Sequence, residues 1–175
     1  MKHSKFLSLA AFAALAACVP QGRPVPVVTA PTPTPAPPPL VETPAAYANW
    51  MDAPRTEGDW TYRAGNGGSA LYGNQRAGAR FALRCDAASR SVILARAGAT
   101  TGDRMVIRTE SQSRALPAAA VSSPLPAIEA RLPASDRLLD AMALSKGRFA
   151  VEVAGTQTLY LPSWSEVTRV IEDCR

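Results

Sequence analysis

The chain has 175 residues, 47% of them hydrophobic, and carries 19 lysines and arginines against 14 aspartates and glutamates. This length and composition predict one compact domain with additional segments. From Tyr47 onward 16 basic and 13 acidic side chains remain, an excess too small and too scattered to favour nucleic acid as a partner.

The first 17 residues have the features of a secretory signal peptide. Lys2 and Lys5 give a basic start, and the apolar run at 6–14 is far shorter than the roughly 20 residues that span a bilayer. The stretch Leu15-Ala16-Ala17-Cys18 resembles the lipobox of bacterial lipoproteins. The resemblance implies cleavage before Cys18 and acylation of its thiol, which makes the lipid bilayer a partner. An ordinary secreted protein cut near Ala17 is the alternative.

The residue after the lipobox bears on the membrane in which the anchor sits. Val19 is not the aspartate that commonly retains lipoproteins in the inner membrane. The resemblance therefore implies an outer-membrane protein that faces the periplasm. Several acyl chains, each contributing about 0.8 kcal/mol per buried methylene, would make the attachment through Cys18 lasting.

Residues 18–46 predict a tether rather than a folded segment. The 28 residues from Val19 to Ala46 contain ten prolines and no aromatic residue, so they cannot bury enough apolar surface to fold. An extended polyproline-II tether of this length reaches on the order of 85 Å. A proline-rich ligand for an aromatic groove is the alternative.

Residues 47–175 predict a β-rich globular domain. Apolar and polar residues alternate around Trp60, over 81–85, 104–108 and 148–153, and further strands are expected at 92–95, 128–132 and 159–161. Asn66-Gly67 favours a type I′ hairpin turn between 60–63 and 69–72. The predicted fold is mainly β, an antiparallel β-sandwich or open barrel of about seven to nine short strands with two short helices.

The two helices are expected near the C-terminus. The first has Ser135 as its predicted N-cap, an apolar stripe of Leu138, Leu139 and Met142, and Gly147 as its stop. The second begins in the capping box Ser163-Trp164-Ser165-Glu166 and ends the chain. Its predicted inward face consists of Trp164, Val167, Val170, Ile171 and Cys174.

The cysteines and the single histidine limit the chemistry. In an exported chain Cys85 and Cys174 are the natural disulfide pair once Cys18 is acylated; two free buried thiols are the alternative. His3 leaves with the signal peptide, which excludes histidine-based catalysis and histidine-ligated metals. We therefore expect no catalytic residue, no metal and no cofactor, and a protein that is not an enzyme.

Three other motifs are better explained by structure than by chemistry. Asp136 and Asp140 share a helix face, whereas glycosidase carboxylates flank a cleft. Ser145 and Lys146 are adjacent, so their side chains diverge on a helix. The stretch 65–70, GNGGSA, fits a dinucleotide fingerprint but is not followed by a helix.

Arginines on the outward positions of predicted strands are a candidate anion-binding surface. They are Arg80, Arg84, Arg104, Arg108 and Arg148. On neighbouring strands their guanidinium groups could hold phosphates or carboxylates of an envelope polymer or partner. Cross-strand pairing with Glu110, Glu129 and Glu152 is the alternative.

Three functions remain in competition. The first is a membrane-anchored, non-catalytic binding or inhibitory module, similar in size and anchoring to the small lipoprotein inhibitors of lysozyme. The second is a structural or assembly component of the envelope or of a secretion system. It is indicated by a resemblance of about the last 95 residues, ending in RVIEDCR, to uncharacterised alphaproteobacterial envelope lipoproteins and an accessory family of type VI secretion. The third is a carboxylate-based hydrolase.

Overall fold

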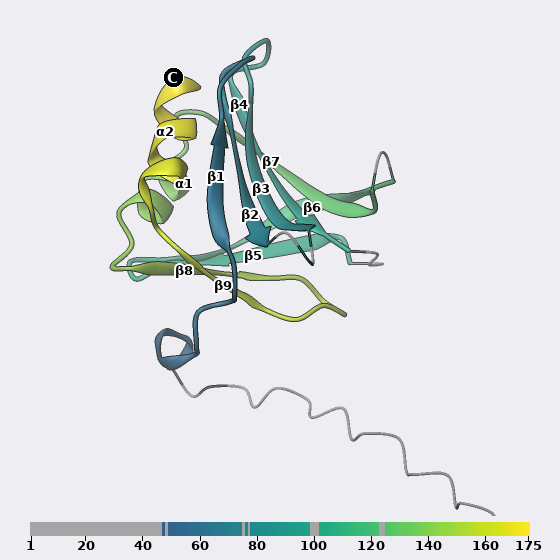
Figure 1. Ribbon diagram of the computed structural model, residues 1–175, viewed down its shortest axis with the longest axis vertical. Coiled ribbons are helices and arrows are strands. Elements are labelled where there is room, and N and C mark those ends of the chain that lie inside the picture. The colour runs from purple at the N-terminus through teal and green to yellow at the C-terminus, as the bar shows by residue number, and fades with distance from the viewer. Residues whose placement is uncertain (1–46, 48, 75, 77, 99–101, 123–124) are drawn as a thin grey trace, which may run out of the picture. The chain divides into compact units, whose positions relative to one another are not determined.

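The computed structural model describes Tyr47 and residues 49–74, 76, 78–98, 102–122 and 125–175. The predicted signal peptide, Cys18 and the tether lie outside the described residues. The described part is mainly β, with nine antiparallel strands in an open half-barrel and two short α-helices, the second at the C-terminus (Figure 1). The predicted fold class is confirmed in its open-barrel form.

The strands form one curved sheet in the order β1-β2-β3-β4-β7-β6-β5-β8-β9. Their bounds are β1 (Asp59–Arg63), β2 (Ser69–Asn74), β3 (Gly78–Asp86), β4 (Ser91–Ala97), β5 (Arg104–Arg108), β6 (Ser113–Val121), β7 (Ala127–Pro133), β8 (Arg148–Glu152) and β9 (Leu159–Pro162). The sequence pattern predicts all of them except β6.

Strand β6 lies between β7 and β5 in the sheet. Its composition gives little sign of a strand. It contains Pro117 and a run of alanines, so alternation is weak. Pro117 pairs with Arg104 at the end of the β5–β6 ladder, and the ladder with β7 begins at Ala118. Because proline has no N–H to donate, it suits the point where a strand changes neighbours.

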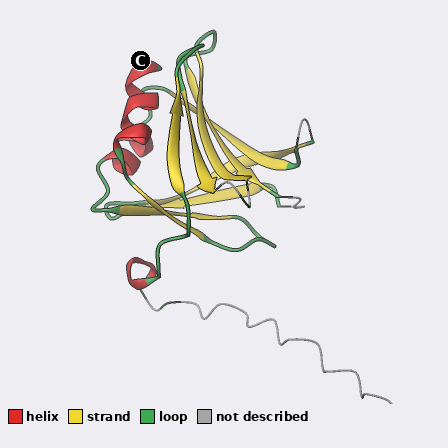
Figure 2. Ribbon diagram, viewed as in Figure 1, coloured by secondary structure: helices red, strands yellow, loops and turns green. Residues whose placement is uncertain are grey.

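The concave face of the sheet carries the core, and both helices cover it. Figures 1 and 2 show α1 (Arg137–Ala143) and α2 (Ser165–Asp173) on the open side of the curved sheet. The predicted inward residues of the helices are buried in one cluster with the inward strand residues, except Trp164, which is 39% exposed. The cluster includes Phe81, Leu83, Leu94, Ile107, Leu138, Leu139, Met142, Val167, Val170 and Ile171.

Both helices begin one residue later than the capping motifs predict. The N-cap of α1 is Asp136 rather than Ser135, because its carboxylate accepts hydrogen bonds from Leu138 N at 2.8 Å and from Arg114 of β6 at 2.7 Å. The N-cap of α2 is Trp164, and no side chain caps it. The capping box is therefore not formed, and the buried Ser163 hydroxyl has no hydrogen-bond partner among the described residues.

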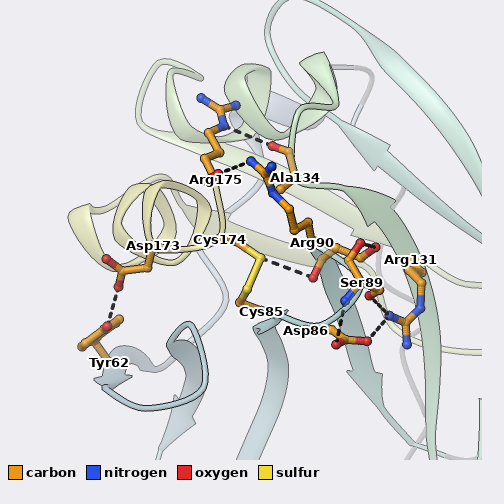
Figure 3. The surroundings of a disulfide bond; sticks show 11 residues. Tyr62, Cys85, Asp86, Ser89, Arg90, Arg131, Ala134, Asp173, Cys174 and Arg175 are labelled. Atoms are coloured by element: carbon orange, nitrogen blue, oxygen red, sulfur yellow. Dashed lines mark hydrogen bonds and ion pairs between the residues drawn. A yellow bond between two sulfur atoms is a disulfide. The ribbon is translucent and has the colours of Figure 1, made fainter.

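A disulfide joins α2 to β3. Cys85 and Cys174 are bonded as predicted, with Cα atoms 5.4 Å apart and a sequence separation of 89 (Figure 3). Closing a loop of this size stabilises a fold by roughly 4–5 kcal/mol in the chain-entropy model. Arg175 adds a hydrogen bond to Ala134 O at 3.1 Å and an ion pair with Asp140 at 2.5 Å. The last turn of α2 is thus held to both β3 and α1.

A third contact ties α2 to the first strand. The Tyr62 hydroxyl of β1 donates to Asp173 Oδ2 at 2.5 Å (Figure 3), and this hydrogen bond raises the pKa of Tyr62. The Arg169 guanidinium lies 4.0 Å from the centre of the same ring, a cation–π contact.

The loop between β1 and β2 closes against the disulfide. Asn66 and Gly67 have φ values of 47° and 85°, and Gly68 N donates to Gly65 O at 2.8 Å. Positive φ at both central positions is what the predicted type I′ turn requires. A Cβ at Gly67 would lie 2.5 Å from Cys85 Sγ, whereas nothing lies within 4 Å of a Cβ at Gly65.

We predict that Gly67→Ala destabilises the fold more than Gly65→Ala. Both glycines have positive φ, so both variants carry backbone strain, but only the Gly67 variant presses a methyl group onto the disulfide. The expected excess is on the order of 1–3 kcal/mol in the free energy of unfolding, measured by urea denaturation. Equal losses in the two variants would contradict the close approach of this loop to Cys85.

An ion pair beside the disulfide depends on pH. Arg131 Nη1 lies 2.6 Å from Asp86 Oδ2 and 3.1 Å from the Ser89 hydroxyl (Figure 3). The hydrogen bond from Arg131, followed by those from Ser89, lowers the pKa of Asp86 to about 2. Since the folded pKa lies below the unfolded value of about 3.9, the stabilisation is complete above that value and disappears as the pH falls through about 2.

We predict that Asp86→Asn lowers the Tm at pH 6 and that the difference from the unmodified chain vanishes near pH 2. Thermal melts at closely spaced pH values measure both. Asp103→Asn is the control, because its carboxylate is 91% exposed and 4.0 Å from Arg104; its melting curve should follow the unmodified chain at every pH. A Tm difference for Asp86→Asn that does not vary with pH would refute the assignment.

Candidate functional site

A groove of about 730 Å³ lies where the segment before β1 meets the ends of several strands. Strands β3, β5, β8 and β9 contribute to it, although they are distant in sequence. Its lining combines aromatic, cationic and hydroxyl side chains: Tyr47, Trp50, Pro54, Arg55, Thr56, Glu57, Arg80, Arg108, Glu152, Thr156, Gln157, Thr158 and Tyr160. The volume falls in the range of small-ligand sites, about 300–1,000 Å³.

One wall of the groove is fixed by hydrogen bonds of Thr56. Its backbone N donates to Tyr160 O at 3.0 Å, and its hydroxyl accepts from Tyr160 N at 2.8 Å. The buried Tyr72 hydroxyl donates to Thr56 O at 2.5 Å. The segment that follows the 3-10 helix η1 (Trp50–Asp52) is thus attached to both β9 and β2.

Aromatic side chains flank this wall. The rings of Tyr47 and Tyr160 meet edge to face, with their centres 6.4 Å apart. Tyr47 is 43% exposed, and Trp50 and Tyr160 are half-buried. Each of the three combines an apolar ring with a hydrogen-bonding group, a combination common at binding surfaces.

The cationic residues of the groove are engaged to different extents. Arg108 of β5 forms an ion pair with Glu152 of β8 at 2.9 Å, across the ladder in which these strands pair. The Arg55 guanidinium lies 5.2 Å from the centre of the Trp164 ring. Arg80 forms no ion pair with any carboxylate among the described residues.

Strand β3 is irregular at Arg80, which lines the groove. Tyr72 pairs with Phe81, but the next residue, Gly73, pairs with Ala79. Arg80 is therefore the extra residue of a β-bulge, which changes the direction of a side chain. Strict alternation predicts Arg80 on the outer face with Arg84; in the structure Arg80 is half-buried beside the buried Phe81 and lines the groove.

Arg96 of β4 is a further arginine beside the groove. It follows Val92 and Leu94 on the inward positions of β4, and its Nη2 donates to the groove residue Gln157 O at 3.2 Å. Its Nε is buried and has no hydrogen-bond partner in the described part of the chain. Burial, followed by the nearby charge of Arg80, lowers the pKa of Arg96.

The other three predicted arginines lie elsewhere or are engaged. Arg84 forms an ion pair with Glu129 of β7 at 2.7 Å. Arg104 is 72% exposed and lies 4.0 Å from Asp103. Arg148 donates to Ala53 O. Only Arg80 and Arg108 share the groove, so the five residues do not form one anion-binding surface.

The remaining motifs have structural partners. Asp136 caps α1 and pairs with Arg114, while Asp140 pairs with Arg175. The buried Ser145 hydroxyl donates to Arg148 O at 2.5 Å and accepts from Glu110 N at 3.1 Å. Lys146 pairs with Glu110 at 2.8 Å, which raises the pKa of Lys146.

Most of the groove cannot be predicted from the sequence. Tyr47, Trp50 and Arg55 precede the first strand and show no periodicity, so no pattern points to them. Tyr160 lies in a predicted strand and Arg96 directly follows the one predicted at 92–95, but nothing in the sequence places them near each other. The available signal is the concentration of aromatic residues directly after the proline-rich tract.

A comparison of this chain with protein-family models, with curated proteins and with solved structures found no match. Within the described ranges, no helix has the length and apolar character needed to cross a bilayer. The same residues contain no group of three or more histidine, cysteine or acidic side chains that could hold a metal ion.

Proposed function

We propose that this protein is a lipoprotein anchored in the bacterial envelope through Cys18, in the outer membrane and facing the periplasm, where it acts as a non-catalytic binding or inhibitory module. The lipobox-like Leu15-Ala16-Ala17-Cys18 supports the anchor, and the ten prolines of 19–46 support a tether behind it. The Cys85–Cys174 disulfide supports export, because such bonds persist in oxidising compartments.

The observation that carries the binding role is the groove itself. Three partly exposed aromatic residues and several arginines converge there, and Tyr47 in its lining directly follows the proline-rich tract in sequence. Aromatic residues and arginine are the side chains most enriched at interfaces. A domain that presents them near its point of attachment is suited to engage a component of the envelope.

A role in assembly is the second candidate. Leu144, the C-cap of α1, is 79% exposed, and Trp164, the N-cap of α2, is 39% exposed. Apolar side chains at these positions could contact a protein partner. The groove is the stronger basis for a proposal, since isolated exposed apolar residues are common on protein surfaces.

We predict that Cys18→Ser releases the protein from the membrane fraction. The expected reason is the loss of the thiol that carries the acyl chains. Fractionation with immunoblotting measures the distribution, and mass spectrometry of the unmodified protein should find an acylated N-terminal Cys18. Cys174→Ala is the control and should stay with the membrane. An N-terminus at Met1 without lipid would overturn the proposed location.

We predict that the full chain in detergent co-sediments with the purified insoluble envelope polymer, the cell-wall sacculus, and that Trp50→Ala weakens this about tenfold. Loss of a stacking aromatic in the groove is the expected cause. Leu144→Ala, which removes an exposed apolar side chain outside the groove, is the matched control. Binding that depends on Leu144 and not on Trp50 would favour the assembly role and reject the groove.

A further inference from the structure

We propose that the ligand of the groove is a saccharide that bears a carboxylate, and that Arg80, supported by Arg96, receives this carboxylate. The inference rests on the binding role proposed above and specifies the chemistry of the same site. Arg80 and Arg96 lie on neighbouring strands, where Arg80 directly precedes Phe81, the register partner of Arg96.

Arg80 and Arg96 lack an acidic partner at ion-pair distance in the described part of the chain, and the Nη atoms of Arg96 donate instead to the backbone carbonyls of Ala97 and Gln157. Neither residue forms an ion pair with a described carboxylate, and the pKa of Arg96 is lowered by burial and by Arg80. Like charges that share a partly desolvated site are unfavourable. An anion bound between the groove and these residues would relieve the repulsion.

Arg80 is the residue that can touch this anion. It lines the groove, whereas Arg108 is paired with Glu152 at 2.9 Å and Arg55 lies over Trp164. Arg96 is not among the lining residues but donates a hydrogen bond to one of them, at Gln157 O, at 3.2 Å. We assign it a positioning role, in which its charge adds to the local potential and its hydrogen bond holds the β8–β9 loop.

The other charges in the groove favour a single carboxylate over a dense polyanion. Glu57 and Glu152 both line it, so a polyphosphate or the surface of an anionic bilayer would meet like charges. A planar carboxylate matches the guanidinium fork in two parallel hydrogen bonds. One acidic group per ligand unit is therefore the best fit to this arrangement.

The remaining lining suits sugar rings. Tyr47, Trp50 and Tyr160 present ring surface on which the C–H faces of a sugar can pack. Thr156, Gln157 and Thr158 of the β8–β9 loop add polar groups for its hydroxyls. Apolar rings with a few polar groups that fix orientation are typical of small-molecule sites.

The test is isothermal titration calorimetry of the full chain in detergent with two matched probes, the linear trisaccharide of galacturonic acid and the uncharged trisaccharide of galactose. We expect the acidic trisaccharide to bind and the neutral one to bind at least about tenfold more weakly, because it lacks the charge-assisted hydrogen bonds. Equal binding of the two probes, or binding of neither, would overturn the proposal.

Five variants locate the contact. Arg80→Gln should weaken binding of the acidic probe about tenfold or more, whereas Arg84→Gln, on the same strand but paired with Glu129, should leave it unchanged. Arg96→Met should weaken binding and Arg96→Lys, which keeps the charge, should largely preserve it. Glu57→Gln should tighten binding, since it removes a negative charge from the groove. Melting curves identify any variant that fails to fold, and Arg80, which is partly exposed, tests the contact without that difficulty.

Two further arms separate the sources of negative charge. Inorganic phosphate and phosphatidylglycerol vesicles should each bind more weakly than the acidic trisaccharide. A preference for either would replace the saccharide with a phosphate ligand and refute the proposal. Retained co-sedimentation with the sacculus that depends on Trp50, together with no discrimination between the trisaccharides, would reject the ligand chemistry while leaving the binding role intact.

Discussion

The two outermost strands of the sheet, β1 and β9, do not pair with each other, and this open seam governs the rest of the structure. In a closed barrel the backbone N–H and C=O groups of the first and last strands would pair with each other, and the sheet would enclose its own core. Here the concave apolar face is covered by α1 and α2 (Figure 2). A nine-residue helix is too short to be stable alone in water. Its position therefore depends on the disulfide to β3 and on the contacts of Tyr62 and Arg175 (Figure 3).

The same seam produces the groove. Because β9 has no strand neighbour on its outer edge, the backbone of Tyr160 is available to Thr56, which bonds to it through both N–H and hydroxyl. Trp60 reaches across the seam in the same way and donates its indole N–H to Pro162 O at 2.8 Å. The segment before β1 thus bonds to the edge of β9, where a closed barrel would have a strand. The same segment contains Trp50 and Arg55, which line the groove.

The fold is more predictable from this sequence than the site, for physical reasons. Alternation identifies strands such as β3 and β8 because their inner faces are buried and their outer faces are polar. Cys85 and Cys174 were identifiable as partners because each lies on an apolar face. The bulge at Arg80 leaves no such signal, since a residue inserted in the register does not change the local composition. The contact of Thr56 with Tyr160 spans 104 residues, a separation that no local pattern encodes.

The distribution of ion pairs explains why the arginines of this domain are not equivalent. On the outer face, Arg84 of β3 reaches Glu129 of β7 and Arg131 of β7 reaches Asp86 of β3, so both pairs cross β4. Ile93 of β4 is the register partner of Arg84 on one side and of Arg131 on the other. It is only 3% exposed, although it is absent from the main core cluster. Exposed pairs of this kind each stabilise a protein by about 1 kcal/mol or less.

Besides stabilising the fold directly, the ion pairs of Arg84 and Arg131 hold the alkyl stems of these arginines where they can shield Ile93 from water. Arg84 and Arg131 therefore help to cover the outer face of the sheet. Arg80, at the register shift of β3, forms no such pair with a described carboxylate and lines the groove. The cross-strand pairing that engages Arg84 and Arg131 therefore does not include Arg80, which is left without an acidic partner at ion-pair distance among the described residues.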